Sequence, residues 1–293
     1  MKYFLTGLII ALAASSPAAA QSCDLTASTS GNSLQKLYDP FAAQDTVVGL
    51  RVTVFNSGDQ NCQARFYISP SDGQLRLSAS GETMAYQIEG TTGGSLPGEY
   101  GPFSVTVAGG GRETVSIQFR VPGQQVVPVG FYTSNLALRG EGPENDPISI
   151  GGSNPILTMA VPARSETSIS GAPSPSLSSL GMAPATINFP DAQMGQTGMV
   201  YVNVWANSSV LVRLTSQHGG VLKHLQNRNL PPIAYSATFD GNVIGLASAY
   251  SVQRNPPMSV AGASYPLLIT LGDTTGRYAG RYQDRITVDV QSN

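Results

Sequence analysis

Residues 200–205 read Val-Tyr-Val-Asn-Val-Trp, and this stretch decides the fold class. Valine alternates with a larger or polar residue at a period of two, which places one set of side chains on each face of an extended chain. Such alternation is typical of an antiparallel strand that packs one face against the core. Trp205 falls on the face opposite Val202 and Val204. We expect it to pack at a sandwich edge, with stacking on a sugar ring as the alternative.

The same alternation recurs along the whole chain. Turn signals such as Asn56-Ser57-Gly58-Asp59 and Asp240-Gly241-Asn242 separate the alternating stretches. Beyond residues 1–20, no long segment shows the 3.6-residue period of an amphipathic helix. Many short strands at this spacing predict an all-β protein built from immunoglobulin-like sandwiches. The other alternating stretches are residues 50–54, 105–107, 115–119 and 286–290.

Residues 1–20 predict a secretory signal peptide. Met1-Lys2 supplies a positive start, residues 4–14 are largely apolar, and Ala18-Ala19-Ala20 is a cleavage signal before Gln21. A transmembrane anchor is the alternative, but about 11 apolar residues are too few to span a bilayer. We therefore expect export through the periplasm to the cell surface.

The composition excludes several classes of partner. Charged residues make up 12% of the chain and the net charge is −2. This balance gives no basic surface for nucleic acid and no polybasic stretch for a membrane. Few charges with many small polar residues suit an extracellular β-protein.

Cys23 and Cys62 are the two cysteines of the chain. In an oxidising compartment an even count indicates a disulfide, which would stabilise the fold by roughly 4 kcal/mol on the chain-entropy model. Free thiols, nucleophilic or metal-binding, are the alternative. A metal site would need further ligands, and the nearest histidine, His218, is far along the sequence.

The two halves of the chain resemble each other. Residues 64–69 match 212–216 with one gap, and residues 84–86 match 233–235. Gly73-Gln74-Leu75 likewise matches Gly220-Val221-Leu222, and residues 130–138 align with 280–288 without a gap. Because the blocks keep their order and a nearly constant offset, we infer a tandem duplication of one β-sandwich.

A Ser/Thr/Gly/Pro-rich stretch separates the two halves. It includes Ala172-Pro173-Ser174-Pro175-Ser176 and has almost nothing to bury, as expected of a linker. A long loop within one domain is the alternative. The expected organisation is a signal peptide (1–20), an N-terminal β-sandwich that is the candidate adhesin domain (21–163), a linker (164–183) and a C-terminal β-sandwich that is the candidate pilin domain (184–293).

The repeated blocks carry a resemblance to a known family. Gly220-x-Leu222, then Ile233-Ala234-Tyr235 with Asp240-Gly241 behind it, and finally Gly280-x-Tyr282-x-Asp284-x-Ile286-x-Val288 resemble the spore coat protein U domain. That family includes subunits of archaic chaperone–usher pili. Cys23, Tyr38-Asp39-Pro40-Phe41 and Cys62 are similar to its N-terminal disulfide region.

The resemblance implies assembly by donor-strand complementation. In such subunits the sandwich lacks its last strand, and a periplasmic chaperone or a neighbouring subunit supplies one. Assembly would also involve an usher. The C-terminal domain is therefore expected to lack its last strand, because the sequence continues only three residues past Val290. A complete sandwich with a terminal last strand is the alternative.

The N-terminus points to a position in the fibre. Gln21 and Ser22 alone separate the expected cleavage site from Cys23, which leaves no donor strand for a neighbour. We expect a pilus tip subunit that attaches to an unknown receptor, cell or abiotic surface. The rival interpretations are a self-contained secreted or outer-coat protein and, less favoured, a periplasmic pilus chaperone.

One apolar loop is a candidate contact for such a surface. Val126, Val127, Pro128 and Val129 lie between Gly123 and Gly130, where the second half has Thr274-Thr275-Gly276-Arg277. An exposed apolar tip would adhere without directional contacts. The alternative is that these valines pack inward at the start of a strand.

Catalytic and metal-binding patterns are weak. His218 and His224 lack a third ligand nearby, and Glu141, Glu144 and Asp146 do not have the spacing of a calcium loop. No Gly-x-Ser-x-Gly elbow or Cys/His pair is present. We predict a non-enzymatic protein without a cofactor.

Overall fold

The computed structural model describes residues 23–30, 33–90, 98–173, 177 and 184–293. The elements that these residues form are strands β1 to β22 and one short 3₁₀ turn, η1 (Pro143–Asn145), joined by turns and loops. The all-β, immunoglobulin-like sandwich prediction is confirmed. The expected signal peptide lies outside the described residues. Within the described residues, no helix has both the length and the apolar composition required to cross a membrane.

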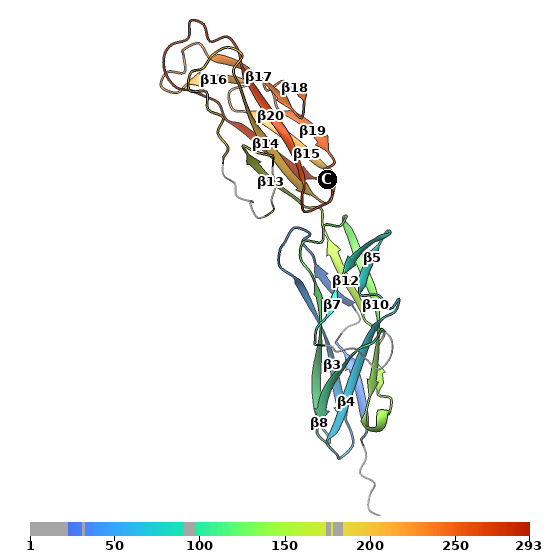
Figure 1. Cartoon of the computed structure of the whole chain (residues 1–293). Coiled ribbons are helices and arrows are strands. Elements are labelled where there is room, and N and C mark those ends of the chain that lie inside the picture. Colours follow the sequence, from blue (N-terminus) through green and yellow to red (C-terminus); the bar gives the residue numbers. More distant parts are fainter. Residues whose placement is uncertain (1–22, 31–32, 91–97, 174–176, 178–183) are drawn as a thin grey trace, which may run out of the picture.

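Two facing sheets form the N-terminal half, residues 23–161 (Figure 1). The first contains, in spatial order, β11 (Ser149–Gly151), β1 (Leu25–Thr29), β3 (Thr46–Asn56), β9 (Arg112–Val121) and β7 (Gln87–Ile88). The second contains β2 (Ser33–Leu37), β12 (Ile156–Val161), β10 (Gly130–Glu141), β4 (Cys62–Pro70) and β8 (Tyr100–Val107). Two short strands extend it, with β5 (Arg76–Ala79) pairing with β10 and with β6 (Glu82–Ala85).

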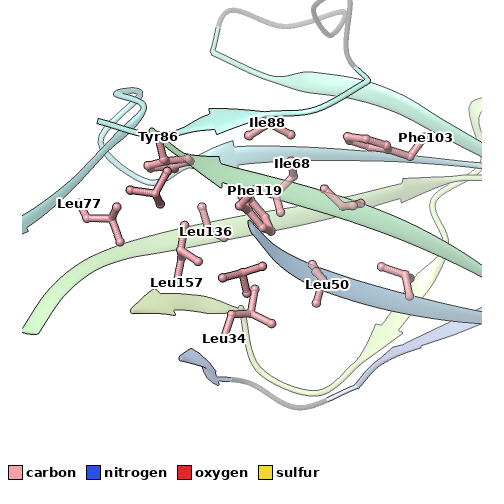
Figure 2. Packing of buried hydrophobic residues seen from close by; sticks show 14 of the residues in the cluster. Leu34, Leu50, Ile68, Leu77, Tyr86, Ile88, Phe103, Phe119, Leu136 and Leu157 are labelled. Carbon is pink, nitrogen blue, oxygen red and sulfur yellow. The ribbon is translucent and has the colours of Figure 1, made fainter. Parts of the chain in front are cut away.

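The core of this half lies between the two sheets (Figure 2). The alternation read from the sequence supplies it: Leu50, Val52 and Val54 of β3 are fully buried, while Arg51 between them is exposed. Aromatic residues fill the middle, and Tyr86 packs edge-on against Phe119 with ring centroids 6.1 Å apart.

Cys23 and Cys62 form the predicted disulfide, with their Cα atoms 5.9 Å apart. It ties the chain just before β1 to the start of β4. Because β1 and β4 belong to different sheets, the bond joins the two layers of the sandwich.

The C-terminal half, residues 165–293, has one large and one small sheet. The large sheet contains β13 (Ser165–Ser170), β14 (Thr197–Ala206), β20 (Ala263–Leu271), β17 (Ile233–Phe239), β16 (Val221–His224) and β21 (Tyr282–Gln283), with β18 (Asn242–Ile244) on β17. The small sheet contains β19 (Tyr250–Arg254), β15 (Val210–Ser216) and β22 (Ile286–Ser292).

The boundary between the halves differs from the predicted linker. Residues 165–170 form β13, which pairs with β14 along its full length, so they belong to the C-terminal sheet. Ile187 and Phe189 pack on the same core, on the other side of the Ser/Pro-rich stretch. Strands on either side of residues 162–164 pair only within their own half in the described chain. Backbone pairing and one buried side chain, Ile169, outweighed the polar composition of this stretch.

Asn207 fixes this short connection. Its side chain accepts a hydrogen bond from the Arg164 backbone N–H at 2.8 Å and donates one to the Pro162 carbonyl at 2.9 Å. The asparagine is 1% exposed, and both its amide oxygen and its amide nitrogen bind the backbone where the chain passes between the halves.

Candidate functional site

In the N-terminal half, strand β10 is covered on both edges. Residues 136–141 pair with β4 on one side, and residues 130–135 pair antiparallel with β12 on the other. The side chains that β10 and β12 turn inward are apolar or hydrogen-bonded, and all are buried except Leu138, which is partly exposed. Leu136 of β10 and Leu157 of β12 are each 0% exposed and enter the same cluster (Figure 2).

In the C-terminal half, the matching strand β22 is an edge strand. It pairs antiparallel with β15 from Ile286 to Ser292, and no described strand pairs with its other edge. Its core-facing residues Ile286, Val288 and Val290 contact the apolar cluster, yet each stays partly exposed to solvent. No residue of β22 is buried.

The two strands are direct counterparts in sequence. Leu136 aligns with Ile286, and both lie at the point where the strand begins to pair with the sheet's middle strand, β4 or β15. The environment differs because β12 pairs with residues 130–135 of β10, directly before the aligned stretch, whereas β13, the nearest strand beyond β22, pairs only with β14. The site is therefore a pair of unpaired strand edges in the described fold, because neither the outer edge of β22 nor that of β13 pairs with another described strand.

The sequence carries a signal for this difference in the segment that follows β10. Leu157, Met159 and Val161 alternate over the last strand of the N-terminal half and are all buried. They follow β10 in sequence and cover its edge, so the first sandwich holds its own last strand.

A buried carboxylate anchors the start of β22. Asp284 is 3% exposed in its side chain. It accepts hydrogen bonds from the Ser216 and Tyr235 hydroxyls, each at 2.6 Å, and from the backbone N–H of His218 at 3.0 Å. Ser216 Oγ in turn accepts from the Gly220 N–H at 2.8 Å. The Gly-x-Tyr-x-Asp motif thus ties β22 to the β15–β16 turn.

The tyrosine of this cluster keeps its proton over the whole physiological range. Burial raises the pKa of Tyr235, and its hydrogen bond to the Asp284 carboxylate raises it further. In the N-terminal half, Tyr86 faces Ser134 at 3.2 Å in the equivalent place. Burial raises the pKa of Tyr86 to about 12. One hydrogen-bonded position therefore uses a neutral partner in one half and a carboxylate in the other.

The apolar loop at residues 126–129 is not a uniform exposed tip. Val127 is 7% exposed and belongs to the core, whereas Val126 and Pro128 are half-buried and Val129 is 49% exposed. For Val127 the burial agrees with the alternative that the valines pack inward, because its side chain belongs to the cluster between the sheets. Val129 alone of the four is well exposed.

The loop also lies at the end of the sandwich that leads into the C-terminal half. Gly130 pairs with Val161, the last residue of β12. The Tyr38 hydroxyl donates to the Pro122 carbonyl at 2.8 Å, and the Tyr38 N–H donates to the Ala160 carbonyl at 2.9 Å. The free end of the N-terminal half is the opposite one, beside the disulfide.

Trp205 and the two histidines pack against other residues of the C-terminal half. Trp205 is fully buried and donates its indole N–H to the Val260 carbonyl at 3.1 Å, which excludes stacking on a sugar. A turn at Gly262 with φ of 63° covers the ring, and a Cβ there would lie 2.6 Å from it. His218 Nδ1 lies 3.3 Å from Asp284 Oδ1 without a hydrogen bond, while His224 packs edge-on against Tyr282.

Fold and site together define a pair of immunoglobulin-like sandwiches, the second of which has an open strand position. No protein-family model matches the sequence, and a search of curated proteins finds no match. The spore coat protein U resemblance therefore rests on its motifs alone.

Solved structures with similar folds include components of chaperone–usher pili. One is a chain of the CsuC–CsuE chaperone–tip adhesion subunit pre-assembly complex from archaic Csu pili of Acinetobacter baumannii. It is 13% identical, with 92% of this chain and 100% of that chain covered and a TM-score of 0.49. A chain of the chaperone–tip adhesin complex of CFA/I fimbriae is 10% identical, with 89% and 96% covered and a TM-score of 0.34. Self-complemented MyfA, the major subunit of Myf fimbriae from Yersinia enterocolitica, is 15% identical, with 47% and 98% covered and a TM-score of 0.29.

Proposed function

We propose that this protein is a structural and adhesive subunit of a chaperone–usher type pilus. Its C-terminal half accepts a strand along β22, first from a periplasmic chaperone and then from a neighbouring subunit. The observation that carries the proposal is the outer edge of β22, which no described strand pairs with and whose three core-facing residues all stay partly exposed, whereas the aligned Leu136 of β10 is fully buried.

Physical reasoning explains why such an edge needs a partner. A free edge presents backbone N–H and C=O groups in a row, ready to pair with another strand. Here the edge lies beside exposed apolar surface of Ile286, Val288 and Val290. A strand with alternating apolar side chains would satisfy both, gaining about 25 cal/mol for each Å² of apolar area covered. Without a partner the same edge is a site of aggregation.

A place at the pilus tip, with attachment through the N-terminal half, extends the proposal. The supporting feature is that β12 closes the first sandwich and β1 pairs with β3 and β11 inside its own sheet. The first described strand is therefore committed to its own fold and not donated to a neighbour. A half that neither donates nor accepts a strand is free to bind a receptor or surface.

The decisive experiment supplies the missing strand in cis. A flexible Gly/Ser linker and the β12 sequence Ile-Leu-Thr-Met-Ala-Val are added after Asn293 of the mature chain. Because β12 runs antiparallel to β10, a strand returning from Asn293 can run antiparallel to β22. We expect a higher melting temperature, less aggregation, and slower hydrogen exchange in residues 286–292.

The matched control carries the same linker with the leucine, methionine and valine of the added strand changed to serine. It should leave hydrogen exchange in β22 as fast as in the unextended chain. Equal exchange and melting for the two extended chains and the unextended one would contradict the proposal and favour a self-contained coat protein. Co-expression with a candidate periplasmic chaperone gives a second readout, in which a stable 1:1 complex is expected.

A further inference from the structure

The outer face of the β1–β3–β9 sheet has an unusual composition near the free end of the N-terminal half. Thr26, Phe55 and Arg112 lie side by side on three adjacent strands, because Thr26 pairs with Phe55 and Phe55 with Arg112. Directly paired residues point to the same face of a sheet. All three are exposed, and the phenylalanine ring is 39% exposed.

The neighbouring row is made of hydroxyl groups. Ser28 pairs with Thr53, and Thr53 with Thr114. The two threonine hydroxyls lie 3.3 Å apart, so one of them keeps a free lone pair or proton that faces solvent. A row farther on holds Arg51, paired with Ser116.

The three rows on this face carry two arginines, and the next row toward the free end holds Asp24, whose carboxylate accepts a hydrogen bond from the Ser57 hydroxyl. Arg51 and Arg112 are exposed and form no ion pair with any described residue, unlike Arg120 farther along β9, which pairs with Asp45 and Glu89. The three rows contain no acidic residue. Glu113 pairs with Val54, which points into the core, so the glutamate belongs to the other face of β9.

The face is also hollowed at this place. A shallow depression of about 420 Å³ lies over it, lined mainly by Thr26, Ser28, Thr53, Phe55 and Arg112. Thr46 of β3 lies at the end of the sandwich where the chain leaves for the C-terminal half. Phe55 is nine positions farther along the strand, a span of roughly 30 Å at strand geometry. The depression is thus near the free end.

From these features we propose that this depression binds an acidic saccharide, a sugar ring that carries a carboxylate. A half-exposed aromatic ring offers an apolar face to the C–H groups of a sugar. Serine and threonine hydroxyls exchange hydrogen bonds with its hydroxyl groups. An unpaired guanidinium binds a carboxylate through two parallel N–H groups. A neutral sugar would leave Arg112 without a partner.

The proposal supplies a ligand class for the attachment role above and rests on it. Its test is nevertheless separate, because the depression lies in the N-terminal half and sugar binding there does not depend on strand uptake by β22. If the chain binds acidic sugars but the added strand does not stabilise it, this inference stands and the assembly mechanism fails. If the added strand stabilises the chain but no acidic sugar binds, the assembly mechanism stands and this inference fails.

The experiment measures binding of three oligosaccharides to the mature chain by NMR titration. Oligogalacturonate and sialyllactose carry the carboxylate on sugars from two different sources, and lactose is the neutral comparison. We expect at least one acidic sugar to bind at least tenfold more tightly than lactose, with an affinity that falls as salt rises. Which of the two binds identifies the source.

Two variants locate the site and two serve as controls. Phe55→Ala and Arg112→Gln should each weaken acidic sugar binding at least tenfold while leaving the melting temperature within a few degrees. Phe131→Ala removes a 66% exposed phenylalanine from the other sheet, and Arg281→Gln removes an exposed arginine from the C-terminal half. Both should bind like the unchanged chain. Equal affinity for lactose, no binding at millimolar sugar, or an equal loss with Phe131→Ala would overturn the proposal.

Discussion

Strands β10 and β22 share an aligned sequence and pair with equivalent strands, β4 and β15, yet only β10 has a second strand, β12, on its other edge. The difference comes from residues that follow β10 in the chain. Leu157, Met159 and Val161 of β12 bury themselves against β10, and no described residue does this for β22. Whether a sandwich is complete therefore depends on one short alternating strand, and a strand's own sequence does not reveal whether its edge is free.

The comparison also separates two sources of stability. The N-terminal half has a closed core, a disulfide between its sheets and a last strand of its own. The C-terminal half relies on a smaller buried cluster and on the Asp284 hydrogen bonds that hold the start of β22. A donated strand would raise the free energy of unfolding of the C-terminal half, because a ligand that binds only the folded state stabilises that state.

The largest expected effect tests this contrast at an aligned pair of residues. Leu136→Ala should destabilise the N-terminal half by about 3 kcal/mol, since it leaves a cavity in a closed core. Ile286→Ala should cost about 1 kcal/mol, because its side chain is already partly in water. Chemical denaturation, followed by hydrogen exchange in β10 and β22, assigns each loss to its half.

The added β12 strand sharpens this prediction. Once a strand covers β22, Ile286→Ala should become nearly as costly as Leu136→Ala. Equal losses in the unextended chain would mean that β22 is already covered, and the contrast between the two strands would fail.

The second prediction concerns the position where Asp284 replaces Ser134. Asp284→Asn should destabilise the C-terminal half by about 2 kcal/mol, because an NH₂ group then faces donors that the carboxylate satisfied. Ser134→Ala should cost about 1 kcal/mol, the value of one neutral hydrogen bond, here to Tyr86. Thermal melting of both variants, with the unchanged chain as reference, gives the ratio. A larger loss for Ser134→Ala would show that the carboxylate adds nothing to the position.

Much of the fold could be predicted from the sequence because two-residue alternation is a local signal. The alternation around Val202 and Val204 indicates the all-β fold class, and the two cysteines indicate the disulfide. The aligned blocks of the two halves can likewise be read directly from the sequence. The full burial of Trp205 does not follow from this alternation, which places it on the face opposite Val202 and Val204; a turn at Gly262, far away in sequence, covers its ring.

The features that the sequence did not predict share a cause. Each of them depends on pairing or packing between segments that are distant in the chain. Residues 165–170 look like linker, but their backbone completes a sheet with β14. Val127 lies in an apolar loop, but the core needs its side chain. The face around Phe55 could not be found in advance, because its rows form only when β1, β3 and β9 come into register.

The smallest expected effect compares two exposed aspartates that hold loops. Hydrogen bonds from Arg120 and from the Gly123 N–H hold the pKa of Asp45 below its usual range, and the Thr275 N–H does the same for Asp273. A carboxyl with a lowered pKa in the folded state stabilises the fold above its ordinary pKa, near 4, and loses this contribution as pH falls through the lowered value. Asp45→Asn should therefore lower the melting temperature slightly at about pH 6 and leave it unchanged at about pH 2.5. Asp273→Asn should shift the C-terminal half less, because Asp45 has an arginine partner at 2.8 Å and Asp273 has none among the described residues. A loss of the same size at both pH values would show that packing, and not the carboxylate charge, holds these loops. The ionised Asp45 and Asp273 would then add nothing to the stability of their halves.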